Sequence, residues 1–147
     1  MNRHDEPRFS FSEVCRAAGI STRTVHNTLY STCAGCGLRA TTGSSTRDHR
    51  WSMRDALRLY LVLFVRSRAL SPKVLSPNFG AAELAACDPV IEQILSGQSP
   101  LIFIGQRTGR VTIDELPRGA DWGAAAIDGR YLNELVRRLS SAGEGDA

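Results

Sequence analysis

The 147-residue sequence predicts an α+β fold that is mainly helical. Hydrophobic residues make up 42% of the chain, which is sufficient for a packed core. Several segments with apolar residues at helical spacing follow a helix-capping sequence. Short apolar segments in the second half of the chain lie beside glycine-containing turns and predict strands.

The first predicted helix spans residues 10–18. Ser10 and Glu13 have the spacing of a capping box, in which the serine hydroxyl accepts from the Glu13 amide and the carboxylate reaches back. Gly19 follows and is expected to end the helix, because glycine adopts positive φ without a steric penalty. The chain then turns sharply before the next helix.

The second predicted helix spans Thr22–Tyr30 and is capped by Ser21. Val25 and Leu29 lie one turn apart, so one face of this helix is expected to pack against the protein. The first turn of the helix is otherwise polar. A helix of this kind presents its N-terminal turn to solvent or to a ligand.

A β-hairpin and a long helix are predicted next. The hairpin strands are expected near Leu38–Thr41 and Arg47–Trp51, on either side of a turn rich in Ser, Thr and Gly. Ser52 and Asp55 then begin a helix that continues to about Leu70. This helix is apolar on almost every side, which indicates that it is buried or that a partner covers its second face.

The second half of the chain is predicted to be a small α/β region. One or two helical pieces are expected around Pro89, and the sequences LIFIG, RVTI and AAAID are expected to be strands. Residues 129–139 have apolar positions on one side only and predict a final amphipathic helix.

The charge is distributed unevenly along the chain. Residues 1–77 hold twelve Arg and Lys against five Asp and Glu, whereas residues 78–147 hold six against ten. We therefore predict a basic N-terminal domain at 1–77 that meets a polyanion, and an acidic region at 78–147 that mediates self-association or binds a partner. A fragment ending near Pro77 is expected to retain weak affinity for the polyanion.

The predicted order of helix, glycine turn, helix, hairpin and capped helix is that of a winged helix-turn-helix, which places the second helix in the major groove of DNA. Arginine can bond guanine and asparagine can bond adenine in that groove. Hydroxyl groups and helix N-termini suit phosphates. The predicted DNA-binding residues are Ser21, Thr22, Arg23, Thr24, His26, Asn27, Arg39, Arg47, His49 and Arg50.

Residues 9–75 resemble the MerR-type DNA-binding domain. The matching motifs are Phe11-Ser12-Glu13-Val14, Gly19-Ile20-Ser21-x-x-Thr24 and Arg50-Trp51-Ser52-x-x-Asp55. This resemblance implies a DNA-binding transcriptional regulator. Phage excisionases and terminase small subunits have similar domains, so the motifs do not distinguish among these proteins.

The sequence departs from the MerR pattern in three places. His26-Asn27-Thr28 stands where the family usually has Arg-Tyr-Tyr, and the hairpin is longer than usual. The long dimerising coiled coil is absent, because proline, glycine and predicted strands interrupt residues 78–147. The type of effector and the way the family activates promoters are therefore not transferred to this chain.

The predicted DNA-binding features also have simpler structural interpretations. Gly19 occurs in ordinary helical corners, and Arg23 and His26 are compatible with solvated surface positions. Arg50 is also compatible with a role in supporting the hairpin. Two hairpin arginines have acidic neighbours that could balance their charge; these four residues are Arg47, Arg50, Asp48 and Asp55.

Cys33 and Cys36 have the spacing of half a zinc site, and His26 and His49 are the only candidates to complete it. We expect no bound metal. The two remaining cysteines are predicted core residues, Cys15 and Cys87. The segment GQRTGR lacks the lysine of a phosphate-binding loop, and no catalytic constellation stands out, so we expect neither a cofactor nor enzymatic activity.

The sequence thus predicts an N-terminal winged helix-turn-helix followed by a small α/β region. The predicted function is sequence-specific binding of double-stranded DNA by a cytoplasmic homo-oligomer, with a dimer favoured and no membrane partner. Two alternatives remain open. One is a phage-type packaging or excision protein with the same DNA-binding domain, and the other is a protein-interaction module that binds no DNA.

Overall fold

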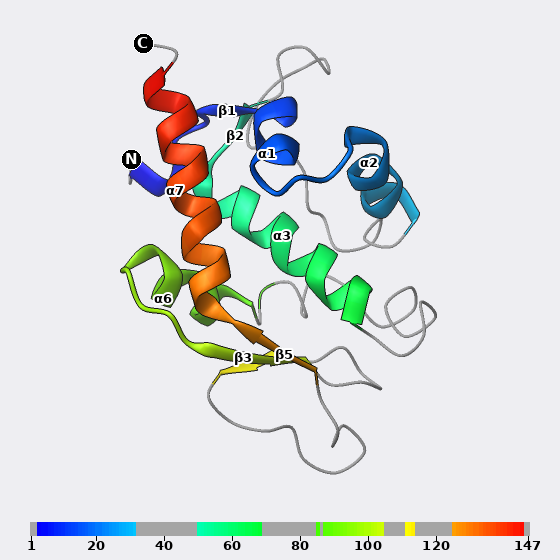
Figure 1. Cartoon of the computed structure of the whole chain (residues 1–147), viewed down its shortest axis with the longest axis vertical. Coiled ribbons are helices and arrows are strands. Elements are labelled where there is room, and N and C mark those ends of the chain that lie inside the picture. Colours follow the sequence, from blue (N-terminus) through cyan, green and yellow to red (C-terminus); the bar gives the residue numbers. More distant parts are fainter. Residues whose placement is uncertain are drawn as a thin grey trace.

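The computed structural model describes residues 3–31, 50–68, 85, 87–104, 111–113 and 125–145. The described part is mainly helical with short strands, which confirms the α+β class (Figure 1). In chain order, the described elements are η1 (Arg3–Asp5), β1 (Phe9–Ser10), α1 (Phe11–Ala17), α2 (Thr22–Ser31), β2 (Arg50–Trp51), α3 (Met53–Arg68), α6 (Asp88–Leu95), β3 (Leu101–Ile104), β4 (Val111–Ile113), β5 (Ala125–Asp128) and α7 (Gly129–Gly145).

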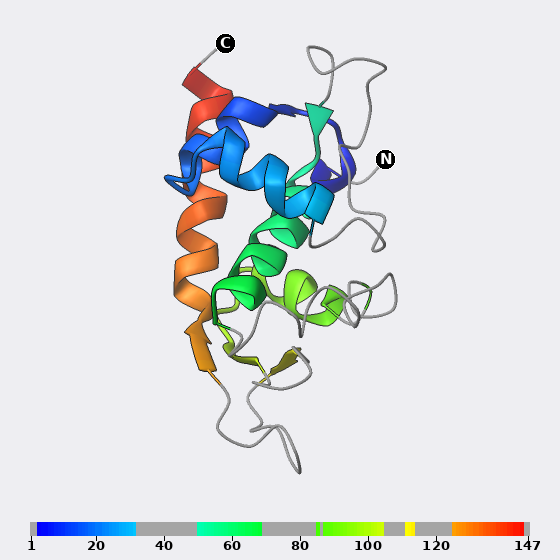
Figure 2. The same cartoon turned by 90° about the vertical axis from the view of Figure 1, so that its right-hand side faces the viewer.

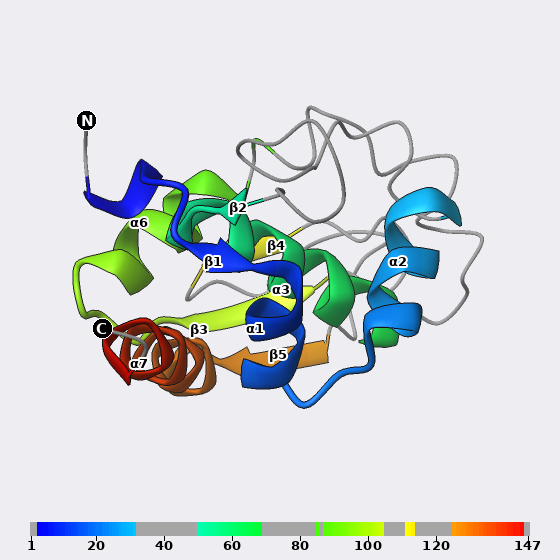
Figure 3. The same ribbon diagram turned by 90° about the horizontal axis from the view of Figure 1, so that it is seen from above.

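The helices are arranged around α3. The long helix α7 runs along one side of the molecule, from the β3–β5 pair at one end to α1 at the other (Figure 1). Helix α2 lies on the opposite side of α3 from α7, as the view from above also shows (Figure 3). None of the helices in the described part of the chain combines the length and apolar character that a membrane span requires.

Two small antiparallel sheets lie at opposite ends of the molecule (Figure 2). In the first, β1 pairs with β2, with Phe9 opposite Trp51 and Ser10 opposite Arg50. The second has the strand order β4-β3-β5, and Ile102 of the central strand lies opposite both Ile113 and Ile127. The three strands of the second sheet confirm the sequence prediction, whereas the β1–β2 pair was not predicted.

Both halves of the sequence contribute to one hydrophobic core. The most buried residues of α3 are joined by residues of α6 and α7 in a single cluster. The members at least 98% buried are Phe9, Val14, Cys15, Val25, Ala56, Leu57, Leu59, Tyr60, Leu61, Val62, Cys87, Val90, Ile91, Ile94, Ile102, Leu132, Leu135 and Leu139. The prediction that α3 is a buried helix is confirmed. The domain boundary at Asn78 stays a prediction, although elements on both sides of it share this core.

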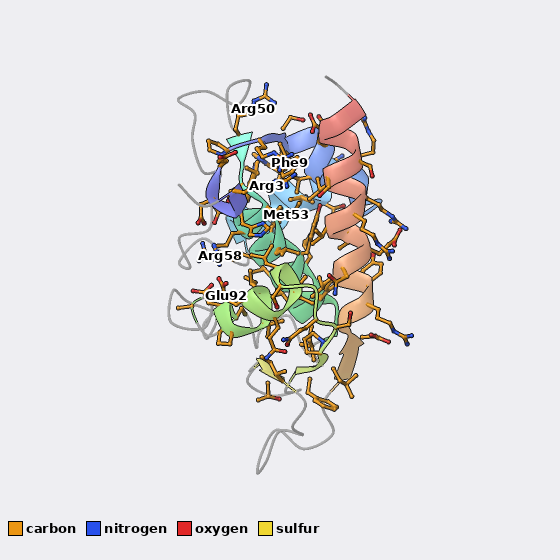
Figure 4. All side chains as sticks on the ribbon, turned by 90° about the vertical axis from the view of Figure 1, so that its left-hand side faces the viewer. Arg3, Phe9, Arg50, Met53, Arg58 and Glu92 are labelled. Atoms are coloured by element: carbon orange, nitrogen blue, oxygen red, sulfur yellow. The ribbon has the colours of Figure 1, made fainter. Side chains whose placement is uncertain are left out.

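Ion pairs also join α3 to its neighbours. Arg54 pairs with Asp5 of η1, 2.7 Å away, and with Glu92 of α6. Arg58 pairs with Asp88 at the start of α6, at 3.1 Å. Figure 4 shows Arg58 and Glu92 on the same side of the protein. Such partly exposed pairs each contribute at most about 1 kcal/mol, so the core provides most of the attachment.

The junction between β5 and α7 requires a glycine. The buried Gly129 amide donates to the Pro100 carbonyl at 2.8 Å, and a Cβ atom at Gly129 would overlap that same oxygen. The Asp128 carboxylate caps the helix by accepting from the Arg130 amide at 2.9 Å. Helix α7 continues to Gly145, beyond the predicted end at Leu139.

Candidate nucleic-acid interface

Helix α1 ends in a tight turn centred on Gly19, which has φ +67°. The Gly19 amide donates to the Arg16 carbonyl at 3.0 Å, and the Ile20 amide donates to the Cys15 carbonyl at 3.0 Å. These two bonds form a Schellman motif, in which the residue with positive φ is usually glycine. The prediction that Gly19 ends the first helix is confirmed.

Ser21 begins α2 by capping it, as predicted. The Thr24 amide donates to the Ser21 hydroxyl oxygen at 3.2 Å, and the two hydroxyl groups lie 2.8 Å apart. Val25 lies in the same turn but is buried, so it attaches α2 to the core. The cap and the buried valine together fix which face of α2 is presented to solvent.

The predicted DNA-binding residues at the start of α2 lie within its cap and its first two turns. All of them are exposed, namely Ser21, Thr22, Arg23, Thr24, His26 and Asn27. The amides of Thr22 and Arg23 lie in the first turn of α2, at the positive end of the helix, where phosphate oxygens are favoured. The structure therefore brings together a cationic side chain, hydroxyl groups and an amide at one helix terminus.

Arg50 lies in β2 and is also exposed. Figure 4 shows its side chain pointing away from the body of the protein. Asp55 pairs with Arg58 at 2.8 Å, and Arg50 has no carboxylate partner in the described part of the chain. The alternative in which Arg47 and Arg50 balance Asp48 and Asp55 stays open, because Arg47 and Asp48 lie outside the described residues. The other predicted residues of the hairpin, Arg39, Arg47 and His49, lie outside the described residues, as do Cys33 and Cys36.

The described arginines fall into two groups. Those from Arg54 onward whose side chains are described all form ion pairs, namely Arg54, Arg58, Arg130, Arg137 and Arg138. Those before Arg54 have no carboxylate partner among the described residues, and they are Arg3, Arg8, Arg16, Arg23 and Arg50. The described arginines without an ion pair therefore lie on η1, α1, α2 and β2 and directly before β1.

Sequence analysis missed Arg8 as a candidate. Arg8 directly precedes β1, and its amide donates to the Trp51 carbonyl of β2 at 3.1 Å, so its backbone lies beside the β1–β2 sheet. The Arg8 guanidinium also lies 5.1 Å from the centroid of the Phe9 ring. No local signal in the sequence indicates this placement, because it depends on the pairing of β1 with β2.

The two described cysteines are core residues, as predicted. Burial raises the pKa of the Cys15 thiol to about 11 and that of the Cys87 thiol to about 12. Both thiols are therefore protonated near neutral pH and are poor nucleophiles and metal ligands. Within the described residues, no group of three or more His, Cys, Asp or Glu side chains is placed to hold a metal ion.

A buried hydrogen bond fixes α1 to α3. The Tyr60 hydroxyl donates to the Val14 carbonyl at 2.6 Å. Tyr60 is 99% buried, and this burial is the main cause that raises the pKa of its hydroxyl. The hydroxyl therefore remains a donor throughout the physiological pH range.

We expect Tyr60→Phe to lower the free energy of unfolding by about 1–3 kcal/mol, because the Val14 carbonyl loses its buried donor. Urea denaturation followed by circular dichroism measures this loss. Tyr131→Phe is the control, because Tyr131 is 40% exposed and its hydroxyl is the only group removed. Equal stability of Tyr60→Phe and the unmodified chain would show that the bond does not hold α1 in place.

Comparisons with protein-family models, with curated proteins and with solved structures find no match for this chain.

Proposed function

We propose that this protein binds double-stranded DNA in a sequence-specific manner and acts as a transcriptional regulator. In this proposal, α1, the Gly19 turn and α2 are the helix-turn-helix, and α2 enters the major groove. The β1–β2 sheet lies at the base of the wing and contacts the DNA backbone. The MerR-like motifs in residues 9–75 agree with this assignment.

The observation that carries the proposal is the distribution of unpaired positive charge. A protein that neutralises DNA phosphates needs cations that are not already neutralised by its own carboxylates. The arginines without carboxylate partners in the described part all precede Arg54, and Arg23 among them lies in the exposed first turn of α2. A helical corner with a purely structural role does not require that arginines with and without carboxylate partners lie in different parts of the chain.

The residues of α2 have chemistry suited to both parts of a DNA site. Arg23 has the planar donor pair that guanine O6 and N7 accept, and Asn27 suits adenine N6 and N7. The hydroxyl groups of Thr22 and Thr24 suit phosphate oxygens. In this proposal, Arg50 of β2 and Arg8, which directly precedes β1, contact the DNA backbone.

We propose further that the protein functions as a cytoplasmic homodimer, associated through its C-terminal region. Two linked binding domains gain affinity from their effective concentration. A symmetric dimer favours a palindromic or repeated site. Mass measurement in solution tests this part independently of DNA.

The proposal is tested by selecting bound duplexes from a random library and measuring the salt dependence of binding to one selected duplex. Replacing Arg8 and Arg50 together by Gln should reduce the slope of log K against log salt by about 2. With two phosphate contacts fewer, binding releases fewer counterions from the DNA. Replacing Arg130 and Arg137 by Gln removes the same charge from ion-paired positions in α7 and is the matched control.

Three outcomes would contradict parts of the proposal. Equal slopes for both double variants, with unchanged circular dichroism, would exclude the β1–β2 sheet from the interface. Weak, salt-insensitive binding without a selected sequence would favour the protein-interaction module. Assembly into a large ring that binds a motor subunit would favour a phage packaging protein.

A further inference from the structure

The last carbonyl group of α1 is bonded by the C-terminal helix. The final carbonyls of any helix lack partners within the helix and need them elsewhere. In α1, the turn amides of Gly19 and Ile20 satisfy the carbonyls of Arg16 and Cys15. The Ala17 carbonyl accepts instead from Arg138 Nη1 of α7, at 3.0 Å.

Arg138 lies on a part of α7 that is anchored in the core, and its own side chain is about half exposed. Leu135 and Leu139 lie on either side of it along α7, and both are fully buried in the shared core. The Arg138 Nε also lies 3.5 Å from Glu134 Oε1, one turn earlier in α7. The end of α1 is therefore attached to a helix whose own position is set by the core.

We propose that Arg138 is a positioning residue for DNA recognition by α2. Ala17 immediately precedes the turn that sets the direction of α2, so a bond at Ala17 restrains this turn from outside the helix-turn-helix. The acidic C-terminal region then has a second role besides self-association, since it holds the DNA-binding helix at the angle required for the groove. This inference rests on the proposed function and assigns a residue that does not touch DNA.

The neighbouring residue Arg137 provides a matched control. It pairs with the same Glu134 carboxylate but makes no bond to α1. Arg138→Met and Arg137→Met each remove one positive charge while retaining a long apolar side chain. A difference between these variants therefore reports the Ala17 bond and not the change in net charge.

The first measurement is amide hydrogen exchange without DNA. In Arg138→Met, we expect the protection of the Ile20 amide to fall about fivefold, with no change at Leu61 in the core. Arg137→Met should leave the exchange protection of both amides unchanged. Arg138→Lys should restore the protection of the Ile20 amide, because lysine retains a donor for the Ala17 carbonyl. If Arg138→Met lowers the exchange protection of the Ile20 amide no more than that of the Leu61 amide, the inference is overturned.

The second measurement is affinity for a duplex selected by the unmodified chain, at a temperature where every variant is folded. We expect Arg138→Met to weaken binding about fivefold, Arg137→Met less than twofold, and Arg138→Lys to restore it. Equal affinities for the two Met variants would overturn the inference. If the unmodified chain binds no duplex, the proposed function fails, while a response at Ile20 would still support the restraint of the turn by α7.

Discussion

A fragment that ends at Pro77 is expected not to fold. It lacks α6 and α7 and therefore six core side chains at least 98% buried, namely Val90, Ile91, Ile94, Leu132, Leu135 and Leu139. Burial of one such side chain contributes roughly 1.5–3 kcal/mol, so their combined loss approaches the whole stability of a typical domain, about 5–15 kcal/mol. The apolar residues of α3 would also be exposed to water.

Far-UV circular dichroism and a thermal scan of the fragment measure this effect. The expected result is low helicity with no cooperative transition. Adding the separate 78–147 segment is the control, because it supplies the missing face of the core and should restore helicity. A fragment that melts cooperatively by itself would show that the basic domain is independent, as the charge division in the sequence predicts.

The second large effect is expected for Arg23→Ala. If Arg23 bonds a guanine edge, the variant should lose about 1–3 kcal/mol of binding free energy on a selected duplex and less on a random duplex. Arg23 is exposed and has no ion pair in the described part of the chain, so stability should change by less than about 0.5 kcal/mol. Fluorescence anisotropy with both duplexes, together with a urea titration, measures these quantities.

Arg16→Ala is the control for Arg23→Ala. Arg16 is also exposed and without a carboxylate partner, but it lies in α1 and is not expected to read bases. Its loss should weaken binding similarly on both duplexes. Equal losses for Arg23→Ala on the two duplexes would make Arg23 a phosphate contact, and unchanged affinity on both would remove it from the interface.

The local parts of this structure could be predicted from the sequence. The caps at Ser10 and Ser21, the turn at Gly19 and the start of α3 at Ser52 each depend on residues within one helical turn. One detail of the Ser10 cap differs. The Glu13 carboxylate accepts from the Ser10 hydroxyl and not from its amide, since Ser10 also belongs to β1.

The parts that depend on distant residues could not be predicted in the same way. The pairing of Phe9 with Trp51 joins segments that no local rule connects. The charge state of the candidate interface is also a tertiary property. Arg54 and Arg8 look alike in the sequence, but only Arg54 meets an acidic side chain, Asp5, in the folded chain.

The attachment of α1 through backbone oxygens has a consequence for how this protein can evolve. Tyr60 bonds the carbonyl of Val14, and the acceptor is present whatever side chain that position carries. Substitutions on the outer face of α1 therefore leave this attachment intact. In the proposed DNA complex, substitutions at exposed positions of α1 and α2 would change the contacts with DNA without removing this attachment.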